Sequence, residues 1–117
     1  MKFYSSKPDG NQSADLEPAR YFNLALTQIE KISEWMITAD QGAQPLLVHL
    51  DMYLHISTKY PDMAERRLQG LEIARVREIF FDWYERCQKK IPSQFRSEIK
   101  ESAIDIFDRL EKIANGE

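Results

Sequence analysis

The chain has 117 residues, of which 43% are hydrophobic and 30% are charged. This length and composition predict one globular domain and exclude a wholly disordered or fibrous chain. The formal net charge of -3 gives the protein no overall attraction to nucleic acid or to an anionic membrane.

The N-terminal 14 residues, 1–14, are dominated by Ser, Lys, Pro, Asp, Gly, Asn and Gln, a composition that predicts a flexible tail. A first helix is expected over residues 15–39, with Asp15 as its N-cap. Gly42 follows and can adopt the left-handed conformation that ends a helix. The apolar face of this helix repeats at helical spacing and consists of Phe22, Ala25, Leu26, Ile29, Ile32, Ser33 and Met36, while Leu24 and Trp35 lie well off it.

A second helix is expected over residues 45–59, before the Tyr60-Pro61 step, because a residue that precedes proline disfavours helical geometry. Its apolar residues surround most of its circumference: Leu46, Leu47, Val48, Leu50, Met52, Tyr53, Leu54 and Ile56. A helix that is apolar nearly all round is typical of a protein interior. We therefore expect this helix at the centre of the domain or at an interface.

The third helix, expected over residues 62–90, contains the most strongly patterned stretch of the chain, residues 71–91. Gly70 is a weak point inside it, so a bend is expected there. One third of the circumference carries the stripe around which the other helices should pack. This stripe consists of Ile73, Val76, Phe80, Trp83, Tyr84, Cys87 and Ile91.

A fourth helix is expected over residues 93–114, between the Ile91-Pro92 step and Asn115-Gly116. Its predicted core face is Phe95, Ile99, Ser102, Ala103, Ile106, Leu110 and Ile113. No segment shows the alternation of a strand. Helices joined by short turns pack antiparallel, so residues 15–117 are predicted to form an all-α, single-domain antiparallel four-helix bundle.

The sequence contains no run that approaches the roughly 18 apolar residues of a membrane-spanning helix. Its N-terminus, MKFYSSKPDGNQS, lacks the apolar segment of a signal peptide. Cys87 is the single cysteine, which argues against a secreted disulfide scaffold. These features predict a cytoplasmic protein with no membrane association.

Residue types that carry chemistry are few and scattered. His49 and His55 lie six residues apart, about 240° around the helix, so one face cannot present both to a metal. Asp51 and His55 are spaced i,i+4 and are interpreted as a local pair, although they could form half of an acid-base unit. Cys87 is interpreted as a core residue. We therefore predict no enzyme, no metal, no cofactor and no small-molecule ligand.

A group of basic residues brackets the turn between the third and fourth helices, with Glu85 and Glu98 among them. It consists of Arg86, Lys89, Lys90, Arg96 and Lys100. These residues could contact a nucleic acid backbone. They could equally complement the dipole of a helix C-terminus and keep the protein soluble, and the acidic overall balance favours this second interpretation.

The third helix also carries apolar residues that lie off its main stripe. Leu68, Leu71, Arg75 and Ile79 follow one another at i, i+3, i+7 and i+11, the spacing of a helix-helix seam. Trp35 and Ile104 lie off the core faces of their own helices. An apolar strip rimmed by charge is typical of an interaction surface. The alternatives are that the third helix lies inside the bundle, or that its phase slips at Gly70.

No motif identifies a family or a reaction. The leading hypothesis is a non-enzymatic protein-interaction module of the adaptor, regulator or inhibitor type. It would act through the apolar strip, as a homodimer or by binding a different protein. The alternative is a small nucleic-acid-associated subunit that uses the basic group.

Overall fold

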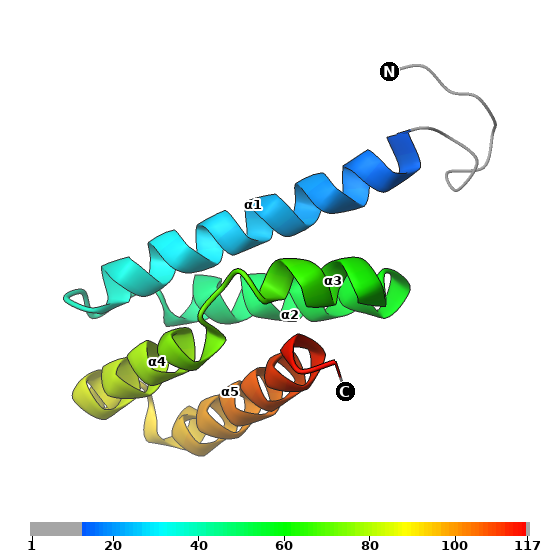
Figure 1. Ribbon diagram of the computed structural model, residues 1–117. Coiled ribbons are helices and arrows are strands. Elements are labelled where there is room, and N and C mark those ends of the chain that lie inside the picture. Colours follow the sequence, from blue (N-terminus) through cyan, green and yellow to red (C-terminus); the bar gives the residue numbers. More distant parts are fainter. Residues whose placement is uncertain (1–12, 117) are drawn as a thin grey trace.

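The computed structural model describes residues 13–116, which are all-helical and contain no β-strand (Figure 1). The all-α fold class is therefore confirmed for this part of the chain. The flexible tail predicted for residues 1–14 falls outside the described residues as far as residue 12, whereas Ser13 and Ala14 belong to the first helix rather than to a tail. The helices are α1 (Ser13–Met36), α2 (Ala43–Lys59), α3 (Pro61–Leu68), α4 (Ile73–Cys87), the 3-10 helix η2 (Gln88–Lys90) and α5 (Ser93–Ala114).

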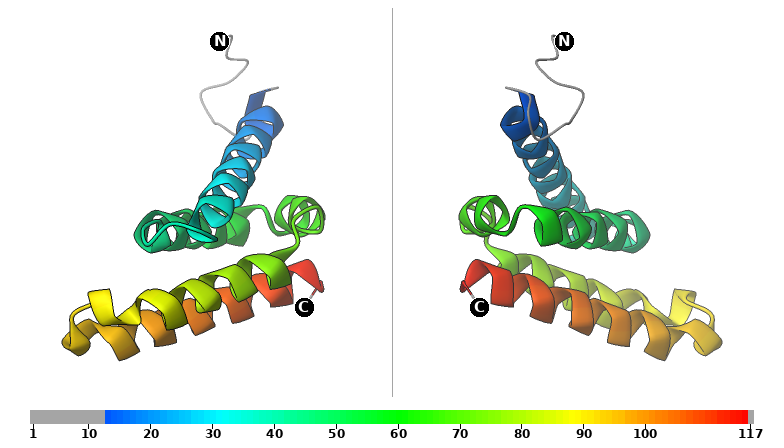
Figure 2. Two further views of the ribbon diagram at one scale, coloured as in Figure 1. Left: turned by 90° about the vertical axis from the view of Figure 1, so that its left-hand side faces the viewer. Right: turned by 90° about the vertical axis from the view of Figure 1, so that its right-hand side faces the viewer.

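The helices form three layers (Figure 2). In the views along the molecule, α2 and α3 lie side by side in the middle, α1 slants across them on one side, and α4 and α5 lie on the other. The C-terminal end of α1 also reaches α4, and α2 contacts α1, α3 and α5. The four long helices expected from the sequence become five in the described residues, because the third is divided.

The division lies between Leu68 and Ile73, where a helix over residues 62–90 was predicted with only a bend at Gly70. Leu68 and Ile73 are five residues apart, so a continuous helix would direct them about 140° from each other. Both side chains are buried. Because the helix breaks, the apolar face of α3 and that of α4 can both lie against the core. One continuous helix would point these two faces in different directions.

The core is centred on Phe80 of α4, which is fully buried. Its ring centroid lies 5.2 Å from that of Phe81, 5.9 Å from that of Trp83 and 5.9 Å from that of Phe107 on α5. The predicted stripe of the third helix is confirmed, because six of its seven members are buried. The seventh, Ile91, is half-buried. The buried members are Ile73, Val76, Phe80, Trp83, Tyr84 and Cys87.

The bounds predicted for α5 are confirmed, but its core face is rotated from the predicted one. Phe107 is fully buried although it is not part of the predicted face, whereas Phe95 and Ser102, which are part of it, are exposed. The buried face of α5 is centred on Ala103, Phe107 and Leu110. Phe107 is buried because its ring packs against the rings of Phe80 and Phe81 on α4.

A second aromatic contact joins the first three helices. The ring centroids of Phe22 on α1 and Tyr53 on α2 lie 4.9 Å apart, and both side chains are fully buried. The Tyr53 hydroxyl donates a hydrogen bond of 2.7 Å to the backbone carbonyl of Ala64 on α3. Burial raises the pKa of Tyr53, so this hydroxyl remains a donor at any physiological pH.

Gly42 forms the turn between α1 and α2, with a φ of 110°. The left-handed conformation predicted for this glycine is confirmed. A Cβ at this position would lie 2.7 Å from Cγ of Met36 and 3.2 Å from Cε3 of Trp35. Glycine therefore permits both the backbone conformation and the close approach of α1 to α2.

Candidate protein-interaction surface

The strip predicted on the third helix is not a surface of this chain. Leu68, Leu71 and Ile79 are 0, 7 and 9% exposed, whereas Arg75 is exposed. Leu68 lies on α3, Leu71 lies in the turn after it, and Arg75 and Ile79 lie on α4, so the i, i+3, i+7, i+11 spacing does not describe one helical face. The prediction of an exposed strip was wrong because the helix breaks where the phase slips.

The other two predicted interface residues, Trp35 and Ile104, are exposed. They lie on different helices, Trp35 near the end of α1 and Ile104 on α5. Trp35 belongs to a larger group of exposed apolar side chains on α1 and α2, which we call the α1–α2 face. This face consists of Tyr21, Leu24, Trp35, Val48 and Met52, each between 48 and 57% exposed.

The part of the α1–α2 face on α1 is a strip beside the buried face of that helix. At 100° per residue, Tyr21, Leu24 and Trp35 fall within an arc of about 60°. The buried residues Phe22, Ile29 and Met36 fall in a separate arc. Thus α1 has two apolar stripes, of which only one is covered by the other helices that the structure describes.

The part on α2 lies opposite the buried residues of that helix. Val48 and Met52 are four residues apart and point about 160° away from Leu50, which is fully buried. The sequence placed this helix either at the centre of the domain or at an interface. Its position between α1, α3 and α5 accounts for one side, while Val48 and Met52 occupy the side that these helices leave uncovered.

The two strips point to the same side of the molecule, as the Phe22–Tyr53 contact shows. Phe22 faces α2, and its neighbour Asn23 turns toward α3, where it accepts a hydrogen bond from Arg67. Tyr21 turns about 100° in the opposite sense, away from α3.

On α2, the Tyr53 hydroxyl reaches α3, and the next residue, Leu54, is also buried. Met52 therefore turns outward on the side away from α3. Figure 2 shows this side of α1 and α2 with no other helix over it.

The basic group predicted as an alternative site makes contacts within the chain. Arg86 donates hydrogen bonds to the carbonyls of Met36, Ile37 and Ala39, at 2.7, 2.7 and 3.1 Å. It therefore caps the C-terminus of α1, where a positive charge also complements the helix dipole.

Lys90 forms an ion pair with Asp40 and lowers the pKa of that carboxyl. Arg96 donates to the carbonyls of Ile91 and Lys89 and so holds the turn before α5. The ammonium of Lys100 lies 5.7 Å from the ring centroid of Tyr84. Four of the five basic residues thus support the junctions between α1, α4 and α5.

The sequence candidates for catalysis and metal binding are dispersed. Nε2 of His55 lies 3.5 Å from a carboxylate oxygen of Asp51, and both side chains are more than half exposed on α2. Neither residue lines either of the two cavities considered below. Among residues 13–116, no three His, Cys, Asp or Glu side chains are grouped so that they could hold a metal. Cys87 is buried.

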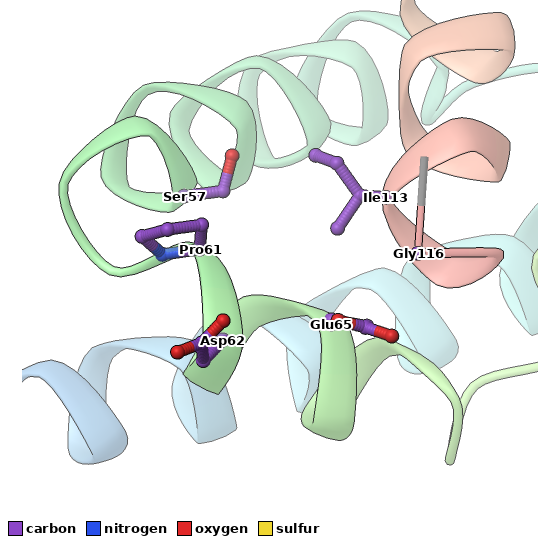
Figure 3. Close-up of a pocket in the computed structure, with 6 residues that line it drawn as sticks. All are labelled: Ser57, Pro61, Asp62, Glu65, Ile113 and Gly116. Atoms are coloured by element: carbon purple, nitrogen blue, oxygen red, sulfur yellow. The ribbon is translucent and has the colours of Figure 1, made fainter.

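Two open cavities lie on the surface, and the second of them shares Leu24 with the α1–α2 face. One, of about 220 Å³, lies where the end of α2, α3 and the end of α5 meet, and it is lined by Ser57, Pro61, Asp62, Glu65, Ile113 and Gly116 (Figure 3). The Ser57 hydroxyl donates to the backbone carbonyl of Leu54 on its own helix, so it is engaged within α2, and the other polar side chains of this cavity are the carboxylates of Asp62 and Glu65. The other, a groove of about 530 Å³, is lined by Ala19, Arg20, Asn23, Leu24, Thr27 and Arg67.

Comparison with protein-family models, curated proteins and solved structures found no match to this chain. In the part of the chain that the structure describes, no helix combines the length and apolar composition needed to cross a bilayer. Of the large apolar side chains that are exposed among the described residues, five lie on the α1–α2 face.

Proposed function

We propose that this protein is a non-enzymatic protein-interaction module of the adaptor, regulator or inhibitor type, and that it acts by self-association through the α1–α2 face. We expect a homodimer whose contact surface lies on α1 and α2 and not on the third predicted helix. We propose a cytoplasmic location, which suits a chain with one cysteine.

The observation that carries this proposal is the grouping of five large, half-exposed apolar side chains on one side of two adjacent helices. Together they present on the order of 500 Å² of apolar surface. The largest apolar patch on a typical monomer covers about 300–600 Å² and is often functional. A standard interface buries about 800 Å² on each partner, polar rim included. The α1–α2 face with its polar neighbours therefore has a suitable size.

The nucleic-acid alternative has less support. Counterion release requires lysine and arginine side chains that can turn to phosphates. Arg86, Lys90 and Arg96 are hydrogen-bonded within the chain, so binding phosphate would compete with the contacts that hold α1 and α5.

Light scattering at several protein concentrations tests the proposal. We expect the mass of the wild type to rise from 13.8 kDa toward twice that value. Met52→Glu should remain monomeric, because the variant places a charge in the apolar contact. Phe95→Glu is the matched control, since Phe95 is 46% exposed and Met52 48%, but Phe95 lies on α5. A monomeric wild type at every concentration, or equal dissociation by both variants, would refute self-association through this face.

A further inference from the structure

The exposed strip of α1 has a symmetric sequence pattern. Tyr21 and Trp35 lie seven residues before and after Gln28, and Leu24 and Ile32 lie four residues before and after it. Tyr21, Leu24 and Trp35 are exposed, while Gln28 and Ile32 are partly buried. When such a strip is turned by 180° about an axis through Gln28, each apolar residue meets another apolar residue.

The exposed side of α2 is symmetric about Val48 to within one residue. Pro45 and Met52 lie three residues before and four residues after Val48, and all three residues are exposed. A two-fold axis close to Val48 would therefore bring Pro45 of one copy near Met52 of the other.

The two centres lie at the same level along the α1–α2 hairpin. Phe22 is level with Tyr53, as their ring contact shows. Trp35 is level with Gly42, where a Cβ would lie 3.2 Å from the indole. Because α1 and α2 run antiparallel, the midpoint between these two contacts places Gln28 level with Val48. One axis can therefore pass both centres.

We infer that the partner of the α1–α2 face is a second copy of this chain, bound antiparallel about a two-fold axis that passes Gln28 and Val48. This inference rests on the proposed function and specifies its geometry. In this arrangement α1 packs along α1 of the other copy and α2 along α2. Tyr21 of one copy packs against Trp35 of the other, twice, at the two ends of the contact.

A second copy suits this face better than an unrelated protein for a physical reason. An isologous contact requires one surface that is its own complement, and two strips with a shared centre meet that requirement. A glutamine at the axis also pairs with itself, because its amide carries both donors and an acceptor. A polar residue at one position in an apolar seam fixes the register of the two helices.

Disulfide trapping tests the geometry. Two variants are made in a Cys87→Ala background, Gln28→Cys and Leu24→Cys, and each is oxidised with glutathione and analysed on a non-reducing gel. Cysteines at position 28 lie beside the axis, within the roughly 7 Å between Cα atoms that a disulfide allows. Cysteines at position 24 lie eight residues out of register, or about 12 Å apart along the helices. We expect Gln28→Cys to cross-link at least about fivefold faster.

A mixing experiment with Tyr21→Cys and Trp35→Cys provides a second measurement. The mixture should form mixed disulfides about fivefold faster than either variant alone forms homodimeric ones, because positions 21 and 35 meet only across the axis. Light scattering and circular dichroism on each reduced variant check that it remains a folded dimer.

The possible results separate the geometry from the proposed function. Equal trapping at positions 24 and 28 would indicate parallel helices and would overturn the antiparallel arrangement. Trapping at neither position in a wild-type dimer would place the contact elsewhere on the face, with self-association intact. A wild type that is monomeric by light scattering would instead overturn the proposed function itself.

Discussion

Replacing Arg86 by alanine tests whether the basic group serves the fold. The guanidinium joins α4 to the last turn of α1 and to the residues that follow it, through the carbonyls of Met36, Ile37 and Ala39. These carbonyls have no partner further along the helix, because α1 ends at Met36. Removing the guanidinium would leave them to water or unpaired.

The three hydrogen bonds are not equivalent. Those to Ile37 and Ala39 are exposed, so water replaces them at little cost. The bond to Met36 is partly buried, and a charge-assisted bond of this kind contributes about 1.5–3 kcal/mol. The charge at the helix C-terminus adds about 0.3–1 kcal/mol. We expect Arg86→Ala to lower the free energy of unfolding by about 2–3 kcal/mol, and Tm by about 8–12 °C for a chain of this length.

Urea denaturation followed by circular dichroism measures this loss, which should appear in the midpoint with an unchanged m-value. Lys89→Ala is the control, because Lys89 is an exposed member of the same basic group and should change stability by less than about 0.5 kcal/mol. Arg86→Lys should fall between wild type and alanine, since an ammonium cannot span three carbonyls. If Arg86→Ala were as stable as Lys89→Ala, the capping role assigned to Arg86 would be wrong.

Three further predictions concern the core, the turn and one ion pair. Phe80→Ala should lower the free energy of unfolding by about 3–5 kcal/mol. The control Phe95→Ala, at an exposed aromatic, should lower it by less than about 1 kcal/mol. Equal losses for the two variants in urea denaturation would contradict the assignment of the core. Gly42→Ala should cost at least about 1–2 kcal/mol, because φ is positive and the new Cβ has no room; an unchanged urea midpoint would count against this. Lys90→Met should raise the pKa of Asp40 toward its usual range, because Lys90 is the largest cause of the lowering, and NMR titration measures this rise. Since the pKa of Asp40 is lower in the folded state than in the unfolded state, the ion pair stabilises the wild type at pH values above the unfolded-state pKa. This stabilisation is lost as the pH falls through the folded-state pKa. Identical titration curves of Asp40 in the wild type and in Lys90→Met would refute the pairing.

Helical periodicity was sufficient to predict the local features. The stripe from Ile73 to Cys87, the buried face of α1 and the bounds of α5 all follow from apolar residues that repeat every three or four positions. Gly42 was predicted as a left-handed residue because glycine adopts that conformation without strain. Each of these features depends on neighbours within a few turns of one helix.

Periodicity gave the wrong result where two elements compete for the same space. Phe107 is drawn inward by the aromatic cluster on α4, and that cluster is distant in sequence. Leu68 and Ile79 are off-phase apolar residues that a single helix would expose. They are buried because the chain breaks between α3 and α4, and the only signal of that break in the sequence was Gly70.

The candidate interaction surface also depends partly on local sequence and partly on tertiary contacts. The sequence determined that α1 and α2 each carry more apolar surface than one buried face requires, through residues such as Trp35 and Val48. Only the tertiary structure decided that α2 lies between α1, α3 and α5, so that these extra residues share one side that no helix within residues 13–116 covers. The sequence of a helix determines which of its residues lie together on its surface. Which of its faces a neighbour covers depends on contacts between segments far apart in the chain, and those contacts have no local pattern.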